Sequence, residues 1–140
     1  MRKIVKSFIN RIANEIMVIA KQKAPVDTAN LQGDIRALKN ATESSLAAVI
    51  GNTKEASYAK FVHFGTKPRE IRPKRKKALK TKFGVFKKVN HPGLKANPYF
   101  KNAVDTYTNS SEFKHTKKAF LDNAKQNIKT KILKDFNASN

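Results

Sequence analysis

Apolar residues recur at helical spacing at both ends of the chain, and at strand spacing only between those ends. Three- and four-residue steps near the N-terminus form one stripe: Ile4, Val5, Phe8, Ile9, Ile12, Ile16 and Ala20. A second stripe near the C-terminus consists of Phe113, Phe120, Ala124, Ile128, Ile132 and Phe136. The first helix is predicted to end near Lys23, because Pro25 disfavours helical geometry in the residue before it. The second is predicted to start at a capping-box-like pair, Asn109 and Glu112. A membrane-surface helix is the alternative for the first stripe.

Shorter elements fill the middle of the chain. Residues 35–41 and 46–51 read as two strands joined by the polar loop 40–45, and the apolar second strand is expected to be central. Asn52 or Thr53 is predicted to cap a short helix that ends at Gly65. Residues 98–107 form a further helix, with Asn97 as its cap and Pro98 in first position. The fold class is α+β: a small, mainly antiparallel sheet flanked by long N- and C-terminal helices in one domain, 1–140, with a frayed tail at 137–140.

A basic block interrupts this pattern. Residues 69–88 contain one acidic and ten basic side chains, in a chain of net charge +20. Phe83, Val85 and Val89 share one strand parity, and Gly84 supplies a turn or bulge. We therefore expect an ordered, extended basic β-hairpin over 71–90, within an insertion at 67–90, whose apolar side chains are anchored to the body of the protein. The candidate contact residues are its cations: Lys67, Arg69, Arg72, Lys74, Arg75, Lys76, Lys77, Lys80 and Lys82.

This charge predicts an anionic partner, which nucleic acid, an acidic protein surface or an anionic membrane could each supply. Lysine predominates, which makes sequence-specific base reading the weaker nucleic-acid option. The chain contains no cysteine, no P-loop and no glycine-rich dinucleotide turn, and its histidines at 63, 91 and 115 have no metal-ligand spacing. We expect no enzyme activity, no metal and no cofactor. No stretch approaches a membrane span, which predicts a soluble protein made and kept on the cytoplasmic side.

Three segments, in order, resemble a family of long-tailed bacteriophage tail components. They are "AKQKAPVDTANLQGDI" (20–35), "YAKFVHFGT" (58–66) and "HPGLKANPYFKNAV" (91–104). Two positions depart from the family pattern, since Ala29 replaces a glycine and Tyr99 replaces a phenylalanine. The residues that carry the resemblance are expected to form turns and core: Pro25, Asp27, Thr28, Leu31, Tyr58, Ala59, His63, Phe64, Gly65, Thr66, His91, Pro92, Gly93, Pro98 and Phe100. Tyr58, Phe61 and Val62 are expected on the inner face of their helix.

Members of this family act as minor tail, tail-completion or tail-to-head joining proteins. The resemblance implies a structural phage or prophage virion protein that oligomerises, as a ring, at the head-proximal end of the tail and joins the tail to the head connector. The implied partners are further copies of this chain, the tail-tube protein and the connector protein. DNA in the lumen of the tail is a further possible partner, and no membrane contact is expected. The implied location is the tail or neck of a virion assembled in the bacterial host cytoplasm. From charge alone, a nonspecific nucleic-acid-binding protein that uses the lysine-rich hairpin is the alternative.

Overall fold

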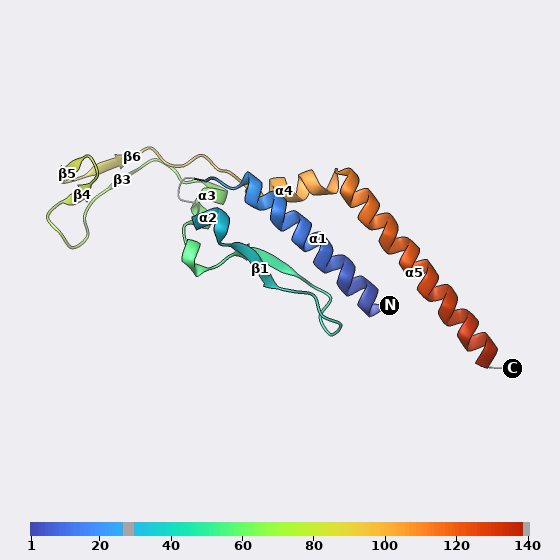
Figure 1. The fold of residues 1–140 in the computed structure, drawn as a ribbon. Helices are drawn as coiled ribbons and strands as arrows, with labels where there is room; N and C mark the ends of the chain where they lie inside the picture. The colour runs from blue at the N-terminus through green and yellow to red at the C-terminus, as the bar shows by residue number, and fades with distance from the viewer. Residues whose placement is uncertain (27–29, 139–140) are drawn as a thin grey trace. The chain divides into compact units, whose positions relative to one another are not determined.

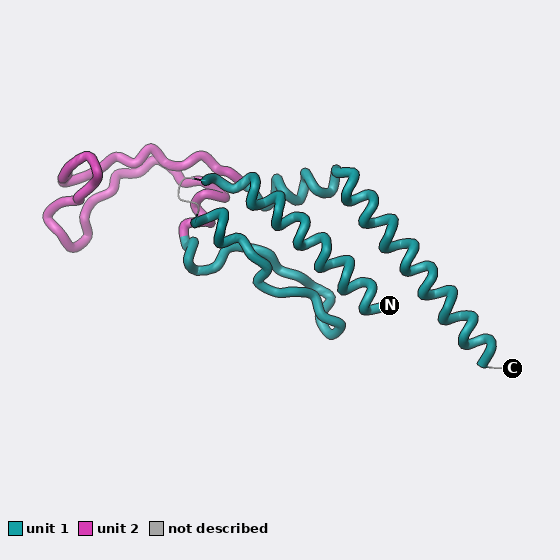
Figure 2. The backbone as a smooth tube through the Cα atoms, viewed as in Figure 1, with its two compact units in different colours: residues 1–57, 99–140 teal, residues 58–98 magenta. Residues whose placement is uncertain are grey.

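The chain forms two compact units, which are coloured separately in Figure 2. A computed structural model describes residues 1–26 and 30–138. Unit 1 comprises Met1–Ser57 and Tyr99–Asn140, and unit 2 comprises Tyr58–Pro98. Figure 1 shows the elements in chain order. The fold is α+β as predicted, and the strands within the described residues pair two by two in three antiparallel ladders.

Unit 1 is built on the packing of α1 (Arg2–Lys23) against α4 (Tyr99–Thr108). The predicted N-terminal helix is confirmed, and Ala24 leaves helical geometry with ψ 143°, as expected of a residue that precedes proline. Helical spacing places Ile16 and Ala20 of α1 in the core with Ala103 and Tyr107 of α4. A protein core therefore covers this part of the α1 stripe. No helix in the described ranges is both long and apolar enough to cross a membrane.

A short hairpin lies beside these helices. Strand β1 (Ile35–Lys39) pairs with β2 (Val49–Asn52), with an irregularity between Ala37 and Lys39. Both strands are shorter than predicted, and the expectation of a central second strand is wrong, because the sheet has two strands and Val49 is exposed. The hairpin loop is tied to α1 instead. The Asn10 side chain donates to the carbonyl of Ala41 at 3.0 Å and accepts from its N–H at 2.7 Å.

Polar side chains join the open end of this hairpin to α2 (Asn30–Gly33) and to α4. The carboxylate of Asp34, which follows α2, accepts the N–H of Thr53 at 2.6 Å and also the Thr53 hydroxyl. Tyr99 is buried, and its hydroxyl donates to Oδ1 of Asn52 at 2.6 Å. The Asn52 amide donates in turn to the carbonyl of Leu31 at 3.0 Å. The tyrosine that departs from the family pattern thus has a specific partner for its hydroxyl.

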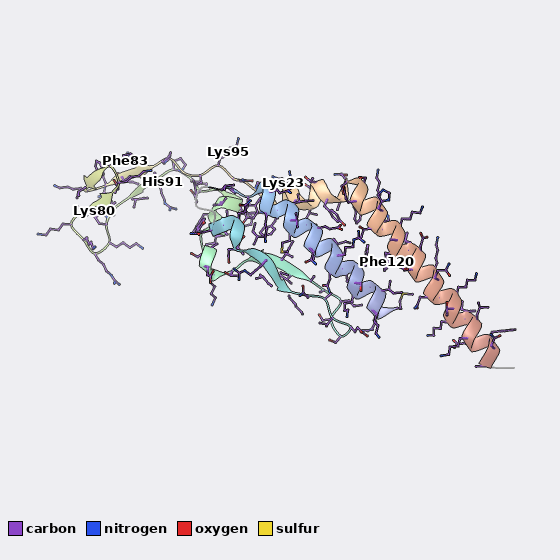
Figure 3. All side chains as sticks on the ribbon, in the orientation of Figure 1. Lys23, Lys80, Phe83, His91, Lys95 and Phe120 are labelled. Atoms are coloured by element: carbon purple, nitrogen blue, oxygen red, sulfur yellow. The ribbon has the colours of Figure 1, made fainter. Side chains whose placement is uncertain are left out.

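The last helix, α5 (Ser111–Ala138), turns back along α1. Its cap is Ser110, whose hydroxyl accepts the N–H of Phe113 at 3.2 Å, so the prediction of Asn109 as cap is wrong by one residue. Asn109 donates instead to the carbonyl of Asp105 at 2.8 Å. Phe120, labelled in Figure 3, belongs to α5. Its ring stacks on that of Phe8 in α1, with centroids 4.2 Å apart.

Among the residues that the structure describes, none of unit 1 covers the second half of α5. The cleft between α1 and α5 is lined at one end by Lys3 and Asn123, near the first turn of α1. Because the two helices run in opposite directions, α5 then continues past that turn. Every side chain from Lys125 to Ala138 is exposed. Of the frayed tail predicted at 137–140, the last two residues lie outside the described ranges.

Unit 2 contains α3 (Ala59–Phe64) and four short strands: β3 (Arg69–Ile71), β4 (Leu79–Thr81), β5 (Gly84–Phe86) and β6 (Val89–His91). Thr53 caps only the separate 3-10 turn Lys54–Ala56, by accepting the N–H of Glu55 at 3.2 Å. The N-cap position of α3 is Tyr58, so the prediction that Asn52 or Thr53 caps the helix that ends at Gly65 is wrong. The expectation that the aromatic residues of α3 are core is wrong: no residue of α3 is buried, and Phe61 and Phe64 are 43% and 77% exposed. A helix of six residues is too short to present a full apolar face.

Candidate functional site

Two loops clasp each other at the base of the basic segment. Thr66 and Leu94 form an isolated antiparallel bridge, in which the N–H of each donates to the carbonyl of the other at 2.9 and 3.0 Å. The Thr66 hydroxyl also accepts the Leu94 N–H at 3.0 Å. The second and third resemblance segments thus meet here, although they are far apart in the sequence. We call the segment that they close, residues 66–94, the arm.

Glycine is required on both sides of this clasp. Gly65 has φ 74° and ψ 176°, a conformation almost confined to glycine, and it follows α3 as predicted. Gly93 has φ 85°. A Cβ at Gly65 would lie 2.6 Å from the carbonyl oxygen of Leu94, and one at Gly93 would lie 2.4 Å from that of Thr66. The glycines of "FGT" and "HPG" therefore allow the two backbones to approach.

Side-chain and backbone bonds finish the clasp. Nδ1 of His91 accepts the N–H of Gly93 at 3.0 Å, which fixes the turn around Pro92. The N–H of Asn97 donates to the carbonyl of Val62 at 2.9 Å, so the chain that leaves the arm is held to α3. These contacts give Gly65, Thr66, His91 and Gly93 a structural role.

The arm continues from the clasp as one antiparallel ladder. Strand β3 pairs with β6 through Arg69↔His91 and Ile71↔Val89. Moving three residues inward from each side of Thr66↔Leu94 gives Arg69↔His91, so the bridge and the ladder share one register. Strands β4 and β5 pair separately around a two-residue turn at Lys82 and Phe83, and Gly84 has φ 133° there. The predicted hairpin is therefore two ladders in series, joined by the loop 72–78.

The arm is almost free of negative charge. Residues 58–98 hold thirteen of the thirty basic residues of the chain and a single acidic one, Glu70. Glu70 pairs with Arg72 and with Lys88, whose Nζ is 3.1 Å from the carboxylate. The hydrogen bond from Arg72, and to a smaller extent the one from Lys88, lower the pKa of Glu70. One carboxylate cannot neutralise the remaining cations of this unit.

The predicted contact residues all lie on the arm, and all are exposed. Arg69 is in β3 and Lys80 in β4, whereas Lys82 is in the turn and Lys67 lies between the clasp and β3. The other five lie in the 72–78 loop: Arg72, Lys74, Arg75, Lys76 and Lys77. The sequence interpretation left out Lys87 and Lys88, which the charge run itself could have indicated. Figure 3 labels Lys80, Phe83 and His91 on this arm.

The remaining motif residues lie near chain turns. Pro25 follows α1, and Leu31 is buried in α2. Asp27 and Thr28, which were expected to form a turn, lie outside the described residues. Tyr58 is in the N-cap position of α3, and the rings of His63 and Phe64 meet edge to face at 4.7 Å between centroids. Helix α4 begins at Tyr99, one residue after the predicted start at Pro98, and Phe100 is half-buried in its first turn.

Phe83, Val85 and Phe86 are exposed rather than anchored, which corrects the expectation for Phe83 and Val85, whereas Val89 is half-buried. Phe83 is 80% exposed, Val85 65% and Phe86 43%. Phe83, Phe86 and Val89 instead line a groove of about 710 Å³. The parity argument assumed one continuous strand, but β5 and β6 are separate strands with Lys87 and Lys88 between them. Phe86, which lines the groove with Phe83, was not recognised from the sequence as part of it.

Residues 1–26 and 30–138 contain no group of three or more His, Asp or Glu side chains that could hold a metal ion. Asp34 and Tyr107 do have shifted pKa values. Hydrogen bonding by the Thr53 hydroxyl lowers the pKa of Asp34, and burial together with the hydrogen bond to Glu15 raises that of Tyr107. Both groups hold elements of unit 1 together.

Residues 1–65 match the model of a protein family described as "Bacteriophage HK97-gp10, putative tail-component". The match contains the first resemblance segment and all but the last residue of the second, and it confirms the resemblance to a phage tail-component family. The comparison with curated proteins and the comparison with solved structures gave no match.

Proposed function

We propose that this chain is a structural virion protein that self-associates, as a ring, at the head-proximal end of a phage tail and joins or completes the tail at the head connector. The observation that carries the proposal is the match of residues 1–65 to a phage tail-component family. Self-association, the position in the tail and the choice of partners are the proposed steps beyond that match. A role without catalysis, in the tail or neck of the virion, follows from the same premise.

Self-association is supported by two complementary surfaces of unit 1. The first is a ridge on α5, formed by Leu121, Ala124, Ile128, Ile132 and Phe136 at helical spacing. Ile132 and Phe136 are 62% and 66% exposed. The second is an apolar groove of about 310 Å³ lined by α1, α4 and the hairpin: Ile9, Ile12, Ala13, Ile16, Ala48, Ile50 and Val104. Two different patches on each subunit produce a head-to-tail contact, and such contacts close into rings when the rotation permits.

A mass measurement tests this step. We expect the full chain to oligomerise alone or when mixed with the tail-tube or connector protein. Ile128→Ser combined with Ile132→Ser should abolish that association, because it removes two exposed apolar side chains from the ridge. Gln126→Ser with Thr130→Ser is the matched control, since these residues are on the opposite face of the same helix. A chain that stays monomeric in every mixture would refute the proposal.

The arm is proposed to contact the neighbouring component. Its excess of cations favours an anionic surface, either an acidic face of the tube or connector or the DNA that passes through the lumen. A strongly basic lumen would hinder the passage of DNA, which favours the protein surface.

Nonspecific nucleic-acid binding is the second candidate, and the acid-poor arm is the observation that favours it. The logarithm of the association constant for duplex DNA should then fall linearly with the logarithm of the salt concentration, with a slope of about −0.9 per phosphate contact. Replacing Lys74, Arg75, Lys76 and Lys77 with glutamine should make that slope less steep. An unchanged affinity would exclude this candidate.

A further inference from the structure

The groove on the arm combines an apolar floor with a cationic rim. Phe83 comes from the turn after β4, Phe86 from the end of β5 and Val89 from the start of β6. Lys82 and Lys88 also line the groove. The Lys82 ammonium lies 5.1 Å from the centroid of the Phe83 ring. Unit 2 therefore brings two phenylalanines and two lysines to one concave surface.

Nothing within unit 2 satisfies both properties of this groove. Glu70, the single carboxylate of the unit, reaches Lys88 but also pairs with Arg72. An occupant must therefore bring apolar side chains for the floor and negative charge for the rim. Strands β5 and β6 each belong to a two-stranded ladder, so each has one edge that an added strand can use.

We infer that this groove binds an extended acidic segment of a neighbouring virion protein, with a large apolar side chain inserted between Phe83 and Phe86. The inference rests on the proposed function, and it specifies what the arm recognises. A fully ordered duplex presents phosphates but no apolar side chain to insert, so it would leave the floor exposed. Single-stranded nucleic acid could stack on phenylalanine, but a concave floor suits an inserted side chain better than successive flat bases.

The test uses the full-length chain and three fluorescent probes: a peptide of alternating glutamate and phenylalanine, an all-glutamate peptide of the same length, and oligothymidylate. We expect the phenylalanine-containing peptide to bind at least about tenfold more tightly than the all-glutamate peptide, because burying one large apolar side chain accounts for such a ratio. Equal affinities of the two peptides would overturn the inference.

Substitution of the floor separates apolar recognition from charge. Phe83→Ser and Phe86→Ser leave the net charge unchanged, so a purely electrostatic mode predicts no effect. We expect each to weaken binding of the phenylalanine-containing peptide about tenfold and to leave all-glutamate binding as it was. Val85→Ser is the matched control, because Val85 is exposed on the same strand but does not line the groove. Protection of the Thr66 and Leu94 amides from exchange would show that each variant keeps the clasp.

Substitution of the lysines tests the contribution of charge to peptide binding. Lys82→Gln with Lys88→Gln should weaken peptide binding more than Lys76→Gln with Lys77→Gln, which removes the same charge from the 72–78 loop. If oligothymidylate binds more tightly than either peptide and loses affinity in the phenylalanine variants, the groove is a single-strand site and the inference is wrong. If the variants lose no peptide affinity while the chain still assembles with tail proteins, the inference fails and the proposed function stands.

Discussion

Gly93→Ala should open the clasp while leaving unit 1 intact. The glycine stands where the two backbones of the arm meet, and its φ of 85° is unfavourable for any residue with a Cβ. The new methyl group would lie 2.4 Å from the carbonyl oxygen of Thr66, well inside van der Waals contact. Since the clashing atom belongs to the backbone, no side-chain rotation can relieve the overlap.

Two contributions set how much Gly93→Ala destabilises the clasp. An alanine in a positive-φ conformation costs about 1–2 kcal/mol. Moving the backbones apart breaks the pair of hydrogen bonds between Thr66 and Leu94, each worth about 1 kcal/mol. The free energy of clasp opening should therefore fall by about 3–4 kcal/mol, which corresponds to amide exchange faster by at least about 100-fold.

Native-state hydrogen exchange at the Thr66 and Leu94 amides measures this directly. Gly33→Ala is the matched control, because no atom lies within 4 Å of the added Cβ and the site is in α2 of unit 1. In the Gly33→Ala variant, the Thr66 and Leu94 amides should exchange at the same rates as in the parent chain. The reasoning would be refuted if Gly93→Ala kept the parent exchange rates, or if Gly33→Ala accelerated them equally.

Two further predictions concern unit 1. Tyr99→Phe should lower the free energy of unfolding by about 1–2 kcal/mol in a denaturant titration, because it removes the hydroxyl that bonds Asn52, and an unchanged midpoint would contradict this. The Asp34 carboxylate has a lowered pKa in the folded chain, so its contribution to stability is present above the unfolded pKa and is lost as the pH falls through the folded value. Asp34→Asn should thus reduce the loss of stability below about pH 4, and an identical acid profile would contradict the role given to Thr53.

The helices could be predicted from the sequence because their signals are local. The stripe of α1 and the proline after it set both its face and its end, and the structure agrees with both. The cap of α5 was assigned one residue too early, since Asn109 and Ser110 are both good caps and only the observed bond to Phe113 distinguishes them. The core role of Tyr99 needed the position of Asn52, which is remote in sequence.

The candidate site was predictable in charge but not in shape. The run of cations indicated the proposed contact surface, because charge is a property of composition. The groove required the break between β5 and β6, which brings Val89 to the same surface as Phe83 and Phe86 and cannot be read from alternation in one strand. The clasp needed the pairing of Thr66 with Leu94, although the two glycines marked the turns on both sides.

The groove on the arm is partly cationic, whereas the α5 ridge is apolar. A rise in salt concentration should therefore weaken binding at the groove and leave association through the ridge unchanged. Raising the ionic strength from about 0.1 M to 1 M shortens the screening length from about 10 Å to 3 Å, which weakens contacts made by exposed lysines. Apolar association does not depend on such screening. We expect the acidic peptide to leave the arm at high salt while association through the α5 ridge persists, as measured by anisotropy and by mass in the same sample. Parallel loss of both would mean that charge on α5, rather than Ile128 and Ile132, holds the copies together.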